Sequence, residues 1–456
     1  MPTQRPGPVN RDPVFHREVG RDYPVVDRAE GAYVYDSRGR RYLDAAGGIF
    51  VVNIGHGVRE VVDAMAAQAG RAAFAHTTVF TSEAELGFAQ KLVDLAPSGF
   101  TKAWICTSGS AANETALKLA REYQLIKGHP ERTKIIARWN SYHGSSLGAL
   151  SMTGQPRRRE PYLPYLQDFP HIEPPYCYRC PFDLTYPGCG LACARALEAA
   201  IEEAGPDTVA AFIAEPISGG PLGTIVPPKE YFPIIREICD RHGILMIVDE
   251  VITGVGRIGH NFGIDHWGTV PDIITAAKGI GGGYVPVGAM LVHERVYAAF
   301  EDAGRSFRHG ETFTGHPVIC AAGAAVLDYV RDHGLIARSA AMGRVLGSLL
   351  QRLHDIPIVG DIRGEGLLWG IELVRDKAAR APFPRERAVA EKVAKVAFET
   401  GLLVIAGTGC ADGVRGDTIS LSPPLTLSEA QAGELVDALE TALRTVSVVE
   451  MAVARA

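Results

Sequence analysis

ILMIVDEVITGVGRIG, residues 244–259, is the stretch that decides the fold. It opens with an apolar run that ends at two acidic residues, Asp249 and Glu250, and continues into a glycine-rich segment without helical periodicity. Similar short apolar runs lie on both sides of it and alternate with helical patterns of about 10–15 residues. Strands that are apolar throughout and separated by helices are typical of a mostly parallel sheet covered on both faces. We therefore expect an α/β fold.

The same pattern extends across most of the chain. The other expected strands are KAWICT (102–107), KIIARW (134–139), TVAAFIAE (208–215), DIITAAKG (272–279), VPVGAMLV (285–292) and TISLSP (418–423). Helical spacing covers residues 57–75, 83–96, 111–124, 229–243, 316–332, 335–354, 385–400 and 428–446. We expect residues 57–330 to form a large domain and residues 331–456 a smaller α+β domain, which an N-terminal arm, residues 1–56, completes.

The composition excludes several classes of protein. The chain has 456 residues, with 46 Lys and Arg against 52 Asp and Glu, and a net charge of −6. Apolar residues make up 46% and charged residues 21%, as in globular proteins, and no concentrated basic face indicates nucleic-acid binding. No run reaches the roughly 18 apolar residues of a membrane span. The polar start is not typical of a secretory signal, and eight cysteines without one indicate reduced thiols, so we expect a cytoplasmic protein.

Residues 152–190 form the longest stretch without a pattern and are interpreted as an inserted loop. The basic run Arg157–Arg159 within it is interpreted as solvated. The loop also contains Cys177, Cys180, Cys189 and Cys193, in the spacing C-x2-C-x8-C-x3-C. Four thiolates could hold structural zinc, although the central gap is shorter than in the commoner zinc ribbons. Free thiols are the alternative, and we expect no metal here.

A phosphate site is suggested where the strand 102–107 runs into a helix. Thr107, Ser108, Gly109 and Ser110 supply hydroxyls, a glycine and the free N–H groups of a helix start, which together suit an anion. A simple helix cap by Ser110 would explain the same residues without a ligand.

Further candidate residues follow the ends of other expected strands. Tyr142, His143 and Gly144 follow KIIARW, Glu215 ends TVAAFIAE, and Asp249 ends its own strand. Open α/β sheets bind ligands at this edge, although solvated acids or a divalent metal cluster are alternatives. Lys278 lies between an apolar run and a cluster of glycines. Because desolvation lowers the pKa of a lysine, this amine is a candidate nucleophile.

One motif points elsewhere. Gly254-Val255-Gly256-Arg257-Ile258-Gly259 matches the dinucleotide fingerprint GxGxxG, and Asp272 follows at a fitting distance, so a dehydrogenase is an alternative. That fingerprint must open a helix, whereas NFGIDHWGTVPDI contains two glycines and a proline and has no helical period. The context therefore argues against nicotinamide binding.

The phosphate site, aromatic residue, buried acid and lysine follow one another in an order that resembles the class III aminotransferases, pyridoxal-phosphate (PLP) enzymes of fold type I. The most specific segments are SGSAANETALKLAR, YHGSSLGALSMTG, AEPISGG, DEVITGVGRIG, AAKGIGGGYVPVGA and HGETFTGHP. The resemblance spans LDAAGGI near residue 43 to SPPLTL near residue 427. It implies a large domain with a mostly parallel seven-stranded sheet, and it reduces GxGxxG to part of a family segment.

The resemblance also implies roles for individual residues. Lys278 would hold PLP as an internal aldimine and then act as base, and Asp249 would keep the pyridine nitrogen protonated. Tyr142 and Val251 would contact the two ring faces. The remaining cofactor contacts would come from Ser108, Gly109, Ser110, His143, Gly144, Glu215 and, across a homodimer interface, Thr312.

The closest subgroup by these residues is the ω-amino acid:pyruvate type. Ile252 and Ser420 stand where members resembling ornithine or 4-aminobutyrate aminotransferases carry glutamine and arginine. Arg415 is the candidate for a mobile arginine that binds carboxylate, and Phe50 matches an aromatic residue of the substrate pocket. The expected function is a cytoplasmic, homodimeric or tetrameric transaminase that moves an amino group from an ω-amino acid or amine to a 2-oxo acid, such as pyruvate, by a ping-pong mechanism. A PLP-dependent aminomutase, epimerase or decarboxylase and an inactive zinc-stabilised scaffold are the alternatives.

Overall fold

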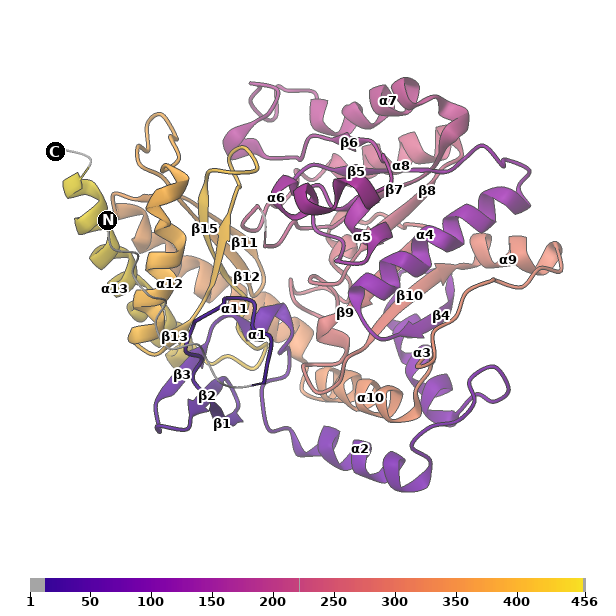
Figure 1. Cartoon of the computed structure of the whole chain (residues 1–456), viewed down its shortest axis with the longest axis horizontal. Helices are drawn as coiled ribbons and strands as arrows, with labels where there is room; N and C mark the ends of the chain where they lie inside the picture. The colour runs from indigo at the N-terminus through magenta and orange to yellow at the C-terminus, as the bar shows by residue number, and fades with distance from the viewer. Residues whose placement is uncertain (1–12, 221, 454–456) are drawn as a thin grey trace.

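A seven-stranded sheet forms the centre of the molecule (Figure 1). The computed structural model describes residues 13–220 and 222–453. In sheet order the strands are β4 (Phe100–Cys106), β10 (Gly288–His293), β9 (Ile273–Ala277), β8 (Leu245–Asp249), β7 (Val209–Ala214), β5 (Lys134–Arg138) and β6 (His171–Ile172). The pairs from β9 to β6 are parallel, and only β10 runs antiparallel to its neighbours in this sheet. The predicted α/β class is confirmed.

Both faces of this sheet are covered, which is why its central strands are apolar at every position. Phe212, Met246 and Val248 point into one core, together with residues of α8 (Tyr231–His242) and α7 (Ala192–Ala204). Their chain neighbours, such as Ile213 and Ile247, point into a second core, together with α4 (Gly109–Ile126) and α9 (Glu294–Asp302). Since successive strand residues face opposite sides, two cores require an unbroken apolar run.

Two smaller sheets lie beside the large one (Figure 1). The first is antiparallel, in the order β11 (Val359–Glu365), β12 (Leu368–Leu373), β15 (Asp417–Leu421) and β14 (Ile405–Thr408). The second joins β1 (Val26–Glu30), β2 (Tyr33–Asp36) and β3 (Arg41–Asp44) to β13 (Leu402–Leu403). The associated helices are α11 (Leu335–Leu350), α12 (Val389–Glu399) and α13 (Glu429–Val453). N-terminal and C-terminal segments thus share a sheet. Of the expected N-terminal arm, residues 1–12 lie outside the described residues.

The segment 152–190 is more ordered than its sequence indicates. It contains the short helix α6 (Pro156–Arg159) and contributes β6, a two-residue edge strand that is too short to show alternation. Arg159, expected to be solvated, is buried and donates hydrogen bonds to the carbonyls of Ser151 (2.6 Å) and Thr153 (2.9 Å), so that interpretation was wrong for this residue. Its guanidinium satisfies carbonyls at the end of α5 (Leu147–Met152) that have no helical partner.

The remaining helices are α1 (Gly47–Phe50), α2 (Arg59–Arg71), α3 (Glu83–Leu95) and α10 (Pro317–Asp332). α10 packs on both α2 and α3, and it approaches α3 closely at Gly323. A Cβ atom at this position would lie 2.5 Å from Cζ of Phe88, whose side chain is fully buried.

Gly323→Ala should therefore destabilise the protein by about 1–3 kcal/mol, because the buried ring has to move. The control is Gly433→Ala in α13, where no atom lies within 4 Å of the new Cβ. That change should stabilise by about 0.5–1 kcal/mol, because a helical glycine costs backbone entropy. Midpoints of urea unfolding measure both. Equal shifts in the same direction would contradict close packing at Gly323.

Candidate active site

A cavity of about 340 Å³ lies where β4, β5, β7, β8 and β9 end. Its lining comprises Val51, Thr107, Ser108, Gly109, Ser110, Tyr142, His143, Gly144, Glu215, Asp249, Val251, Ile252, Ala277, Lys278, Val285, Pro286 and Val287. The carboxyl ends of parallel strands meet at one edge of a sheet, and this is where open α/β folds bind ligands. The strand order thus brings Ser108 and Lys278 to the same cavity, although they are far apart in sequence.

The N-terminus of α4 forms one end of the cavity. Ser108 caps the helix, and its Oγ accepts a hydrogen bond from the backbone N–H of Ala111 at 3.1 Å. A Cβ at Gly109 would lie 2.9 Å from Val251 Cγ2, so a larger residue would push that wall of the cavity away. Ser110 Oγ accepts a hydrogen bond from the N–H of Ser145 at 3.1 Å. Free N–H groups and the helix dipole favour an anion at this end.

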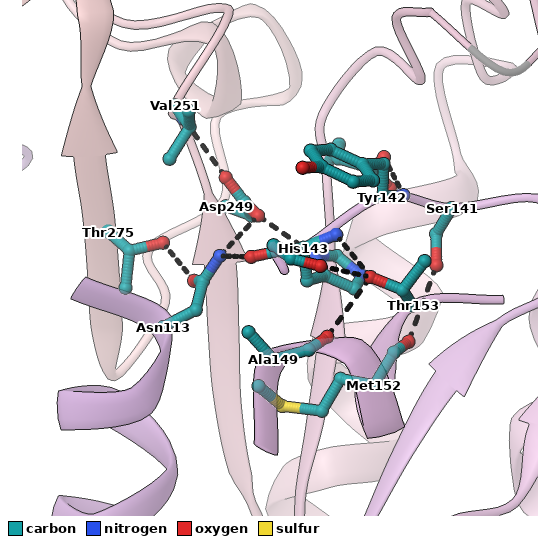
Figure 2. Close-up of polar contacts among 12 residues, drawn as sticks. Asn113, Ser141, Tyr142, His143, Ala149, Met152, Thr153, Asp249, Val251 and Thr275 are labelled. Atoms are coloured by element: carbon teal, nitrogen blue, oxygen red, sulfur yellow. Dashed lines mark hydrogen bonds and ion pairs between the residues drawn. The ribbon is translucent and has the colours of Figure 1, made fainter. Parts of the chain in front are cut away.

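Asp249 is held in the cavity wall by three hydrogen bonds (Figure 2). Its Oδ2 accepts from Asn113 Nδ2 at 2.8 Å and lies 2.8 Å from His143 Nδ1, while Oδ1 accepts from the N–H of Val251 at 3.0 Å. Thr275 Oγ1 donates to Asn113 Oδ1 at 2.7 Å and so fixes the orientation of that amide. A carboxylate that is only 2% exposed needs such donors, because it has lost its water. The network fixes the direction in which the carboxylate faces.

Lys278 follows β9 directly and has a backbone φ of 48°, in the left-handed region that side chains other than glycine rarely adopt. Its Nζ lies 5.4 Å from the ring centroid of Phe50, which is buried. Burial lowers the pKa of its amine from 10.5 to about 8, although the carboxylates of Asp249 and Glu215 act in the opposite direction. A lysine with this pKa is partly neutral near physiological pH and can act as nucleophile or base. Strained backbone of this kind is concentrated at functional sites.

Tyr142 and Glu215 are joined at the end of β5 and β7. Glu215 Oε1 accepts a hydrogen bond from the N–H of Tyr142 at 3.0 Å, and its Oε2 pairs with Arg138 NH2 at 3.0 Å. The guanidinium of Arg158 lies 4.8 Å from the ring centroid of Tyr142. The position of Tyr142 is thus fixed by the hydrogen bond of its backbone N–H to Glu215 and by the contact of its ring with Arg158.

Four predicted groups are not among the residues that line this cavity. Phe50 is buried, and its ring centroid lies 5.4 Å from Lys278 Nζ. Arg415 is exposed and pairs with Asp412 at 2.7 Å. Thr312 is exposed in the segment before α10. The four cysteines of the loop line a separate small hollow, together with Tyr186 and Pro228. All of the chain's eight cysteines are free thiols.

Within residues 13–220 and 222–453, no three or more His, Cys, Asp or Glu side chains are arranged so that they could hold a metal ion. This covers both the cysteine loop and the acids at the strand ends. The glycine-rich segment 254–259 forms turns and not a helix start, so it lacks the structure on which the dinucleotide fingerprint depends. None of the helices in the described part of the chain combines the length and apolar character needed to cross a bilayer.

Sequence reasoning missed Asn113, Thr275 and Arg138. Asn113 and Thr275 are polar residues on surfaces that the patterns mark as buried, and their pairing depends on α4 lying over β9. For Arg138 the sequence did contain a signal, because this arginine ends an apolar strand. In the structure it is 1% exposed. A buried arginine requires an acidic partner, and Glu215 ends the neighbouring strand.

Comparison with known proteins identifies the family. Residues 14–443 match the family described as Aminotransferase class-III. The chain is 37% identical to a putrescine–pyruvate aminotransferase of Pseudomonas aeruginosa, covering 90% of this chain and 88% of that protein. It superimposes on a PLP-bound amine transaminase of an uncultivated Pseudomonas species with a TM-score of 0.90, at 37% identity, over 96% of this chain and 100% of the other.

An (S)-enantioselective ω-transaminase of Thermomicrobium roseum gives a TM-score of 0.87 at 40% identity, with 93% of each chain covered. Both structural relatives superimpose on nearly the whole chain, and the family match also spans nearly the whole sequence. The chain is therefore an enzyme that belongs to the class III aminotransferases, the fold-type I group that the sequence resembles.

Proposed function

We propose that this protein is a PLP-dependent transaminase that takes an amino group from an ω-amino acid or a simple amine and transfers it to a 2-oxo acid, pyruvate in particular, in two half-reactions. The single observation that supports this most strongly is the cavity itself. A buried amine, a fixed carboxylate and an anion-binding helix terminus line one space of about 340 Å³.

The residues fit the cofactor. The N-terminus of α4, with Gly109 and Ser110, suits a phosphate group, and the close approach of Val251 to Gly109 leaves a narrow apolar slot beside it. Tyr142 supplies an aromatic wall. His143 and Gly144 would complete the cradle. When bound, PLP supplies an electron sink for the negative charge that develops at the substrate carbon.

The chain's own residues would perform the proton chemistry. Asp249, held by its three donors, would keep a proton on the ring nitrogen, because an ion pair stabilises the protonated form. Lys278 would remove a proton at one atom of the substrate and return it at another. Its lowered pKa suits both directions, since base and conjugate acid coexist near neutral pH.

Phe50 and Ile252 are proposed as walls of the substrate pocket. The ring of Phe50 lies near the Lys278 amine, and Ile252 lines the cavity. An apolar wall would favour binding of the alkyl chain of an amine and of the methyl group of pyruvate. Arg415 is proposed to bind a substrate carboxylate after its ion pair with Asp412 opens. The relative described as acting on putrescine and pyruvate supports this choice of acceptor.

We propose a homodimer, in which Thr312 of the partner subunit reaches the phosphate end. Exposed apolar side chains near α2, α3 and the segment before α10 support such an interface: Phe74, Val79, Phe80, Leu86 and Phe313. Burial of these side chains in a second copy would remove them from water. The free thiols support a cytoplasmic location, where cysteines stay reduced.

Lys278→Ala should abolish the covalent attachment of PLP. Borohydride reduction of the wild-type holoenzyme should fix the cofactor on the peptide that contains Lys278, as peptide mass spectrometry can measure. Lys134→Ala is the control, because its amine donates to the carbonyl of Ala204 outside the cavity. Attachment at another lysine would refute the assignment.

Asp249→Asn should lower kcat by at least a hundredfold, in line with the usual contribution of a positioned acid–base group. The amide keeps the shape of the carboxylate and removes the charge that holds the ring nitrogen protonated. Steady-state rates with a saturating donor and acceptor measure this effect. Turnover within a few-fold of wild type would mean that the ring nitrogen is not paired with this residue.

A panel of donors and acceptors tests the reaction itself. Stoichiometric conversion of an amine or ω-amino acid, dependent on pyruvate, is the expected result, and each half-reaction should proceed alone with enzyme-bound cofactor. Turnover of an amino acid without any oxo-acid would favour an aminomutase, epimerase or decarboxylase.

Arg415→Ala should slow the turnover of donors that bear a carboxylate more than that of simple amines, because Arg415 is proposed to bind that carboxylate.

A further inference from the structure

A buried ion pair lies at the wall of the cavity, where β5 and β7 end. Arg138 NH2 donates to Glu215 Oε2 at 3.0 Å, to the Glu215 carbonyl at 2.6 Å and to Ser218 Oγ at 3.2 Å. The Arg138 side chain is 1% exposed and that of Glu215 7% exposed. No other ion pair of Arg138 is found among the described residues. Glu215 is thus the counterion of this cation.

The N–H groups of Arg138 are only partly satisfied by hydrogen bonds. Nε and NH1 of Arg138 are buried without a hydrogen-bond partner of good geometry, and its Cζ lies 5.9 Å from the ring centroid of Tyr231. Arginine does not lose its proton in proteins, so the cation cannot relieve this by titrating. Structural stability alone does not favour such a pair, because the desolvation of two charges offsets their attraction. The position of Glu215 suggests what the pair does.

Glu215 connects the cation to the cavity. Its Oε1 accepts from the Tyr142 N–H at 3.0 Å, and its carboxylate is one of two that raise the pKa of the Lys278 amine against the effect of burial. The charged groups that act on that amine are Asp249 of β8 and Glu215 after β7, which line the cavity together with Lys278, His143 and Tyr142. Behind them, Arg138 of β5 contacts Glu215, and the ring of Tyr231 from α8 lies beside Arg138.

We propose that Arg138 is a positioning residue: by pairing with Glu215 it holds the backbone at Tyr142 and sets the protonation of the Lys278 amine. This rests on Lys278 being the reactive amine of the proposed function. In the pair, the positive charge of Arg138 opposes the negative charge of Glu215. Removing the anion leaves a cation, which disfavours the ammonium form, and removing the cation leaves a carboxylate, which favours it.

The test measures protonation of Lys278 without using activity. The full-length protein, freed of cofactor with hydroxylamine, is labelled with a trace of acetic anhydride across a pH series, and mass spectrometry follows the Lys278 peptide. Glu215→Gln should lower the pH of half-maximal labelling by about one unit, a tenfold change in the ratio of neutral to protonated amine. Gln can still accept the hydrogen bond from Tyr142. Arg138→Met should raise the midpoint by a similar amount.

The double variant Arg138→Met, Glu215→Gln should restore the midpoint to nearly that of wild type, because both charges are gone. It also keeps the test decisive if Arg138→Met alone does not fold. Arg132→Met is the matched control: Arg132 is buried and donates only to backbone carbonyls outside the cavity, including that of Gly243 at 2.6 Å. An unchanged midpoint in Glu215→Gln would overturn the proposal, as would a double variant whose midpoint is lowered as much as that of Glu215→Gln.

This outcome is distinguishable from failure of the proposed function. If PLP attaches elsewhere, the adduct experiment fails, while the labelling series still reports on the amine. If Arg138 is only structural, the variants change the urea midpoint but leave the labelling midpoint where it is.

Discussion

The burial of charge at one edge of an apolar sheet is the constraint on which the rest of this structure depends. Asp249, Lys278, Glu215 and Arg138 all lie at or just beyond the ends of strands whose other residues form the core. Isolated charges there would be expensive, so each needs partners with fixed geometry. Asn113 and His143 supply them for Asp249, and the surrounding backbone is shaped to bring them close. The shape of the cavity and the stability of the fold therefore depend on the same few side chains.

The backbone shows how tightly the site is determined. Lys278 adopts a left-handed conformation directly after a regular strand, which turns its side chain away from the direction that the strand would give it. Gly144 has a φ of 146°, and a Cβ there would lie 2.6 Å from Ser110 Oγ. The chain accepts these local costs because the surrounding sheet and helices are firmly packed. Such features indicate a site whose geometry is fixed by the surrounding fold.

Much of this could be predicted from the sequence. The apolar strands, their helices and the seven-stranded sheet follow from pattern and resemblance, and Lys278, Asp249, Tyr142 and the residues around Ser108 converge as expected. What could not be predicted depends on neighbours that are distant in sequence. The partner of Arg138 is set by which strand lies beside β5, and the two-residue β6 has too few positions to show a period. The side chain of Arg415 lies in a loop whose local ion pair with Asp412 no periodicity reveals.

The antiparallel strand β10 determines how far apart the ends of β4 and β9 lie at the edge of the sheet. β10 separates β4 from β9, so the helix terminus at Ser108 and the amine at Lys278 stand at the same edge two strands apart. With neighbouring strands about 4.8 Å apart, the ends of β4 and β9 themselves are separated by roughly 10 Å. The chain after β4 then turns back toward β9, so that a Cβ at Gly109 would lie 3.5 Å from Cβ of Ala277. The strand order thus fixes the spacing of the two strand ends that form this part of the cavity. This spacing depends on the order of the strands, and the substitution of a single side chain leaves it unchanged.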